Sequence, residues 1–109
     1  MKNCFELEGS VLAAWLSKKG GLAVKLAVTY EHKLGEEKIV LESVFLVVFT
    51  EKKKALSLDV AQGDIVKVTG YVHLEHRLST GGNAHQAVML IGDELEVLQK
   101  ARWRENVDD

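Results

Sequence analysis

Histidine is the residue type in this sequence that most readily suggests chemistry, and three of the four histidines lie close together. They occur in "YVHLEHRLSTGGNAHQAVML", residues 71–90, around a pair of glycines. Imidazole is a common zinc ligand and a common general base. His73 and His76 are an odd number of residues apart, so on a strand their side chains point to opposite faces and cannot share one metal ion.

A second pairing of these histidines is geometrically open. If the two arms fold symmetrically about Thr80 and Gly81, His76 lies opposite His85 and their side chains could touch. A tetrahedral site needs further ligands, and no nearby acidic residue completes the set, while Cys4 lies far away in the sequence. We therefore expect two arms of a hairpin, with no metal site and no cofactor.

Catalytic motifs are not evident in the sequence. No segment resembles a nucleophile elbow, a phosphate-binding glycine loop or a Cys–His pair typical of thiol enzymes. We expect a protein that is not an enzyme and has no catalytic residues.

Length and composition limit the class of protein. With 109 residues and 47% apolar residues, the chain has room for one domain with one modest core. No apolar run approaches the ~20 residues that span a bilayer, the first residues lack a signal-peptide pattern, and the single cysteine cannot form an internal disulfide. These features predict a cytoplasmic protein without a membrane partner. The net charge of −2 means that an anionic partner would have to meet a local basic face.

Hydrophobic alternation predicts five strands and one helix. The turns between the strands contain glycine, as in "SKKGG" and "RLSTGGN". A stretch of helix formers follows the third strand, with Thr50 as the expected cap and Gly63 as the expected end. The predicted strands are 4–16, 22–30, 38–49, 64–76 and 85–98, and the predicted helix lies within 50–64.

This order favours an all-β fold, a five-stranded Greek-key OB barrel with one short helix between strands 3 and 4. Gly9, Gly70 and Gly92 each interrupt a good strand, as glycines do at bends and bulges of small barrels. A sandwich with one helix is the alternative fold. We assign residues 1–100 to the barrel domain and residues 101–109 to a short charged C-terminal tail.

Several segments resemble one known family. They are "NCFELEGSV", "LAVTY", "SVFLVVF", "GDIVKVTGYVHLEHR" and "AVMLIGDELEVL". Together they resemble the bacterial single-stranded-DNA-binding proteins and their primosomal replication protein N relatives over roughly residues 3 to 98. The resemblance implies an OB fold, a single-stranded DNA partner, a homodimer or homotetramer, and a role with other proteins of DNA replication, restart or recombination. It leaves RNA open as the ligand.

A basic and aromatic face is the candidate binding site. Val66 and Val68 should point inward, which turns Lys67, Tyr71 and His73 outward. In an OB barrel, lysines of such a face contact phosphates and aromatic rings stack on bases. The candidate nucleic-acid-binding residues are Lys18, Lys19, Lys25, Tyr30, Lys33, Lys67, Tyr71, His73 and Arg77.

The same residues also have interpretations that involve no nucleic acid. Outward lysines commonly form a solvated face, and an exposed tyrosine is frequent at subunit contacts. Trp15, at the end of the first strand, is expected to pack against the protein. The alternative function is an OB-fold interaction or assembly subunit with weak or no nucleic-acid binding.

The third strand, "IVLESVFLVV", is apolar on both faces. Two sets of apolar residues alternate along it, and one set can line the core while the other needs cover; they are Ile39, Leu41, Phe45 and Val47 on one face, and Val40, Val44, Leu46 and Val48 on the other. A second copy of the chain is the simplest cover, so the sequence predicts self-association.

Overall fold

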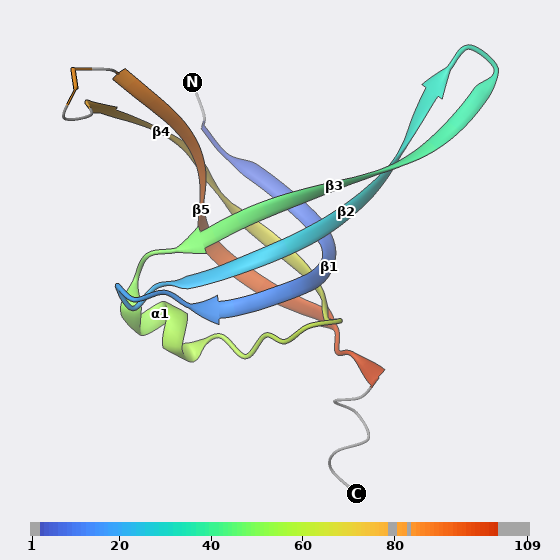
Figure 1. Cartoon of the computed structure of the whole chain (residues 1–109). Helices are drawn as coiled ribbons and strands as arrows, with labels where there is room; N and C mark the ends of the chain where they lie inside the picture. The colour runs from blue at the N-terminus through green and yellow to red at the C-terminus, as the bar shows by residue number, and fades with distance from the viewer. Residues whose placement is uncertain (1–2, 79–80, 83, 103–109) are drawn as a thin grey trace, which may run out of the picture.

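Five strands and one short helix make up the part of the chain that the structure describes, in the order that the sequence predicts. The computed structural model describes residues 3–78, 81–82 and 84–102. The strands pair as β1-β2-β3-β5-β4, with β4 returning to β1, so that the sheet closes into a barrel (Figure 1). The elements are β1 (Phe5–Leu16), β2 (Leu22–Leu34), β3 (Glu37–Phe49), α1 (Lys52–Ser57), β4 (Ile65–Leu78) and β5 (Ala84–Gln99).

The pairing confirms the predicted five-stranded OB barrel. All neighbouring strands are antiparallel except β3 and β5, which are parallel and meet only at Val47↔Leu90 and Val48↔Ile91. This one parallel contact closes the barrel, because β4 and β5 form a hairpin that packs between β3 and β1. The alternative of an open sandwich is thereby excluded.

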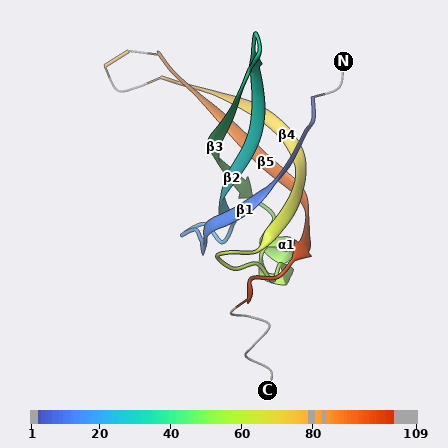
Figure 2. The same ribbon diagram turned by 90° about the vertical axis from the view of Figure 1, so that its right-hand side faces the viewer.

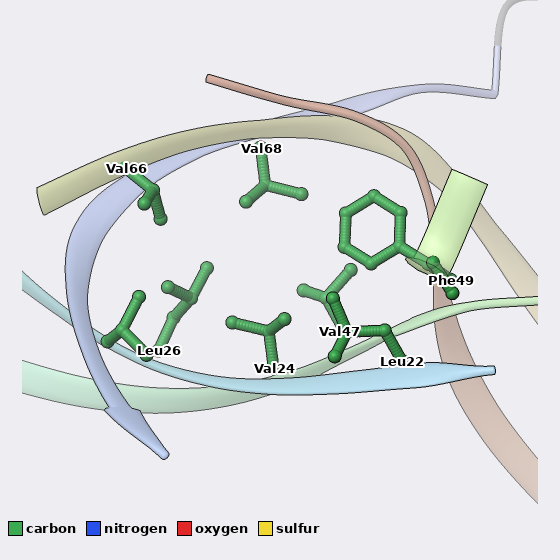
Figure 3. Close-up of a cluster of buried hydrophobic side chains, with 9 residues drawn as sticks. Leu22, Val24, Leu26, Val47, Phe49, Val66 and Val68 are labelled. Atoms are coloured by element: carbon green, nitrogen blue, oxygen red, sulfur yellow. The ribbon is translucent and has the colours of Figure 1, made fainter. Parts of the chain in front are cut away.

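Alternating apolar residues fill the inside of the barrel. Figure 3 shows their side chains pointing toward one another from β2, β3 and β4. Each buried valine or leucine contributes about 1.5–3 kcal/mol relative to an exposed one. Ala55 of α1 packs against this cluster. The labelled members are Leu22, Val24, Leu26, Val47, Phe49, Val66 and Val68, all less than a tenth exposed.

Two glycines let β4 and β5 bend. Gly70 pairs with Gly92, whereas the preceding pair is Thr69↔Glu94, so Asp93 is an extra residue and forms a bulge. A Cβ on Gly70 would overlap the carbonyl oxygen of Ile91, and one on Gly92 would lie 2.5 Å from the Phe49 ring. The predicted bend at this pair is confirmed.

Gly9, the third glycine that interrupts a strand, does not lie at a bulge. The register of β1 against β2 shifts between Val11 and Ala13, not at Gly9. Gly9 is instead required because β1 crosses closely over β2, where a Cβ would overlap the carbonyl oxygen of Ala27.

The helix is shorter than the sequence suggests. It ends at Ser57, and its N-cap is Glu51, without a side-chain cap bond, so the predicted cap at Thr50 is wrong. Leu58 and Val60 follow the helix and pack against the core from a non-helical segment. Their burial at the end of the barrel outweighs the helical propensity of this stretch.

Asp64 links two backbone segments by hydrogen bonds at the end of the barrel where Leu58 and Val60 pack. Its fully buried carboxylate accepts hydrogen bonds from the backbone N–H groups of Ala61, at 3.0 Å, and Ala101, at 2.9 Å. Ala101, the first residue of the expected tail, is buried. Residues 103–109 lie outside the described residues, and the boundary at residue 100 stays a prediction.

Two long hairpins project from the opposite end of the barrel, β2–β3 on one side and β4–β5 on the other (Figures 1 and 2). In the first of them, residues 29–42 are all exposed. The second has a register one residue away from the symmetric one, since Arg77 pairs with His85 and His76 with Gln86. The predicted facing of His76 and His85 is therefore wrong, because the connection after Leu78↔Ala84 has an odd number of residues.

No helix in the described part of the chain has the length and apolar character needed to cross a membrane.

Candidate nucleic-acid interface

A hollow of about 700 Å³ lies on the outside of the barrel. It is open to solvent and is formed where the β1–β2 turn approaches the outward residues of β3, β4 and β5. We call it the outer groove; its lining residues are Ser17, Lys18, Lys19, Gly21, Val48, Thr50, Tyr71, His73, Met89 and Ile91.

Paired strands form the apolar floor of the outer groove. Val48 of β3 pairs with Ile91 of β5, and Ile91 pairs in turn with Tyr71 of β4. Cross-strand partners share a face, so these three side chains lie side by side. Tyr71 is 39% exposed and Ile91 is 7% exposed, which leaves the tyrosine ring available above a closed floor.

The next pair along the same two strands extends this face. His73 pairs with Met89, two residues beyond Tyr71 and Ile91. The imidazole is exposed and the methionine is half-buried. The outer groove thus offers a ring, an imidazole and apolar surface on one side.

A tight turn supplies the cationic side. The N–H of Gly20 donates to the carbonyl of Ser17, and the N–H of Gly21 donates to the Ser17 hydroxyl at 3.0 Å. Gly20 has a φ of 88°, which favours glycine. Lys18 and Lys19 occupy the middle of the turn and are exposed, and neither makes an ion pair with a described side chain.

The structure brings four of the nine predicted residues into this site: Lys18, Lys19, Tyr71 and His73. Lys25 lies outside the groove but on the outer face of the barrel, exposed, between Ala13 of β1 and Leu46 of β3. It can contribute charge beside the groove.

Tyr30 and Lys33 lie elsewhere. Tyr30 is on the face of β2 that carries Leu26 into the core, and its hydroxyl accepts a 3.3 Å hydrogen bond from Ser43. Lys33 pairs with Lys38 near the tip of the β2–β3 hairpin, beyond the barrel. Neither residue lines the outer groove.

Lys67 lies in an acidic part of the surface. Its Nζ is 3.3 Å from the carboxylate of Glu6, and its strand partners are Glu8 and Glu96. It lines a separate hollow together with Glu94 and Glu96. These carboxylates would repel a phosphate chain, and Lys67 does not line the outer groove.

The remaining predictions concern the hairpin tip and metals. The backbone of Arg77 belongs to β4, but its side chain and that of His85 lie outside the described residues. Among the described residues, no group of three histidine, cysteine, aspartate or glutamate side chains could hold a metal ion.

Sequence reasoning missed the floor of the groove and one ring. Val48, Met89 and Ile91 were not predicted to line a site, because the parallel pairing of β3 with β5 cannot be seen in the sequence. Trp15, expected to pack, is 46% exposed. The alternation of β1 could have predicted this exposure. Ala14 packs against the core, so the next residue, Trp15, must point outward.

Comparison with known proteins rests on structure. No family model and no curated protein matches this sequence. The solved structures that are similar include three single-stranded-DNA-binding proteins. The SSB of Plasmodium falciparum in complex with ssDNA has a TM-score of 0.69 at 16% identity, over 91% of this chain and 97% of that chain. A small single-stranded DNA-binding protein from Streptomyces coelicolor has a TM-score of 0.55 at 19% identity, over 89% and 95%.

The third similar structure is a deletion mutant of the single-stranded DNA binding protein from Thermus aquaticus. It has a TM-score of 0.74 at 15% identity, and the match covers 90% of this chain but only 51% of that one. At such identities the likeness shows that the chain shares the OB fold of these proteins. The relation to primosomal replication protein N stays a prediction.

Proposed function

We propose that this protein binds single-stranded DNA in the outer groove. The observation that carries the proposal is the juxtaposition of Lys18 and Lys19 with Tyr71 and His73 around one apolar floor. Single strands bind to OB folds through cations that follow the phosphates and rings that stack on the bases. The fold shared with proteins described as single-stranded-DNA-binding supports the same assignment.

Binding of this kind requires neither a cofactor nor a catalysed reaction, and we propose neither for this protein. A cytoplasmic role in replication, restart or recombination, with partner proteins of those processes, follows from the same proposal. The second candidate function is that of an OB-fold assembly subunit, which the exposed apolar hairpins favour.

A titration of labelled oligo-dT separates the two functions. Three lysines at or beside the groove, contacting phosphates, give a slope of about −2 in a plot of log affinity against log salt, from about −0.7 per contact. Affinity should therefore fall steeply between low and moderate salt. A parallel titration with oligo-U tests RNA as the ligand. Absence of oligo-dT binding at low salt, or a preference for duplex DNA, contradicts the proposal.

We also propose that the chain self-associates through the outward face of β3 between Val40 and Leu46, which leaves the groove residue Val48 uncovered. Val40, Val44 and Leu46 are 68%, 52% and 47% exposed, while the alternate residues Val47 and Phe49 fill the core. An apolar strip of this kind on a strand is unusual for a monomer. A second copy would cover it in a symmetric dimer or tetramer.

Light scattering tests self-association. We expect a mass of at least twice the 12.1 kDa of one chain, and a fall toward one chain in Val44→Lys, which places a charge within the strip. Val88→Lys is the matched control, because Val88 is 71% exposed on the other hairpin. A wild-type mass of one chain at every concentration contradicts the proposal.

A further inference from the structure

One row of paired residues runs around the outside of the barrel and crosses all five strands. Trp15 pairs with Ala23, Ala23 with Val48, Val48 with Ile91, and Ile91 with Tyr71. Partners in neighbouring strands share a face, so all of these side chains are on the outer surface. We call this set the outer row.

The outer row has an exposed aromatic ring at each end and small or apolar residues between. Tyr71 is 39% exposed and Trp15 is 46% exposed, while Ala23 and Ile91 are buried. Four strand spacings of about 4.8 Å separate the two rings, or roughly 19 Å along the surface. Val48, in the middle, is part of the floor of the outer groove. Trp15 therefore continues the groove rather than forming a separate site.

The charges beside the outer row favour a phosphate chain that runs along it between Tyr71 and Trp15. Lys18 and Lys19 flank the row on the side of the β1–β2 turn, and Lys25, two residues from Ala23, flanks it on the other. Beyond Tyr71 along β4, the outward position Thr69 has Glu6 and Glu94 as strand partners. A single strand that leaves Tyr71 is thus repelled along β4 and attracted across β5, β3 and β2 toward Trp15.

We propose that Trp15 is a second base-stacking platform, at the far end of a single-strand path that starts at Tyr71 and follows the outer row. This inference rests on the proposed function and adds the direction of the path. A tryptophan ring with nearly half of its surface exposed provides a stacking face that accepts any base. The occupant is a single-stranded nucleic acid, because lysines border the row on both sides.

Tryptophan fluorescence tests the proposal directly. The chain has two tryptophans, and Trp103→Phe leaves Trp15 as the single reporter. In this variant, oligo-dT of about 16 nucleotides, the upper range of one OB fold, should quench the fluorescence of Trp15 with the same midpoint as the anisotropy of a labelled oligo-dT. The anisotropy measures binding independently of Trp15.

Substitutions provide the second readout. Trp15→Ala should weaken oligo-dT binding about tenfold, the scale of one lost stacking contact, and Trp15→Phe should restore most of the affinity. Tyr30→Ala is the matched control, since Tyr30 is also 46% exposed but faces away from the outer row, and its affinity should stay within about twofold of the wild type. Circular dichroism confirms that each variant is folded.

The outcomes separate this inference from the proposed function. If the anisotropy reports binding while Trp15 fluorescence stays constant and Trp15→Ala binds as well as the wild type, the path is wrong and the function stands. A protein that binds no oligo-dT at all overturns both. If Trp15→Ala lowers the mass in light scattering without weakening binding, Trp15 belongs to an interface between copies and the inference is wrong.

Discussion

Gly70→Ala is expected to destabilise the barrel by about 3 kcal/mol or more, or to prevent folding, because the new methyl group would occupy the position of a backbone carbonyl. The oxygen in its way belongs to Ile91, and the atoms next nearest to the methyl group are the carbonyl carbon of Ile91 and the Cα of Gly92. All of them are main-chain atoms of a paired strand, so no side chain can move aside. The overlap can be relieved only if β4 moves away from β5, and this movement weakens the pairing of the two strands.

Thermal unfolding measures this effect. A loss of 3 kcal/mol lowers the melting temperature by about 10–25 °C in a domain of this size. Gly81→Ala is the matched control: a Cβ there would meet no atom within 4 Å, and we expect a change below about 0.5 kcal/mol. Equal melting temperatures for Gly70→Ala and the wild type would show that the close crossing of β4 and β5 is not required for the fold.

The same pair of glycines shows why so much of the fold was predictable. Interruption of good strands at Gly70 and Gly92 is a local signal, and alternation around it identifies Val66 and Val68 as core residues. Element types and order therefore follow from short-range patterns. Strand pairing in a hairpin also depends on the number of residues in its connection, which is why the register of Arg77 with His85 differed by one residue from the symmetric prediction.

The candidate site was predictable only where alternation and turns define it. Tyr71 and His73 follow from the inward valines of their own strand, and Lys18 and Lys19 follow from the glycines of their turn. Tyr30 was named as a candidate binding residue, although the alternation of β2 already puts it on the face of Leu26. Alternation within a strand determines which face of the sheet a residue occupies, so it is the better predictor of whether a side chain such as Tyr30 can reach the groove.

Lys67 shows a second limit. Its outward direction was predicted correctly, but its carboxylate neighbours Glu6, Glu8 and Glu96 come from two other strands. Which charges meet across a barrel depends on long-range register, and no local pattern in the sequence encodes it. The acidic surface beside the groove could therefore be found only in the structure.

The lysines of the β1–β2 turn are expected to carry most of the salt dependence of binding. Replacing both Lys18 and Lys19 by alanine removes two phosphate contacts. The plot of log affinity against log salt should then become less steep by about 1.4, from a slope of about −2 to about −0.7. At 50 mM salt this corresponds to a loss of about 70-fold in oligo-dT affinity, if each contact contributes nothing at 1 M. The turn itself should persist, since its hydrogen bonds involve Ser17, Gly20 and Gly21.

A control with the same net charge distinguishes local contacts from the overall field of the protein. Lys33→Ala with Lys38→Ala removes two positive charges from the β2–β3 hairpin, where the two residues pair beyond the barrel. Charges separated by more than a Debye length of ~14 Å at 50 mM salt interact weakly, so this variant should keep the wild-type slope and bind within about twofold of the wild type. If the hairpin variant instead loses as much affinity and slope as the turn variant, the single strand follows the β2–β3 hairpin and the outer groove is not its site. If neither variant changes the slope, the phosphates are not held by these lysines, and the cationic side of the proposed interface is wrong.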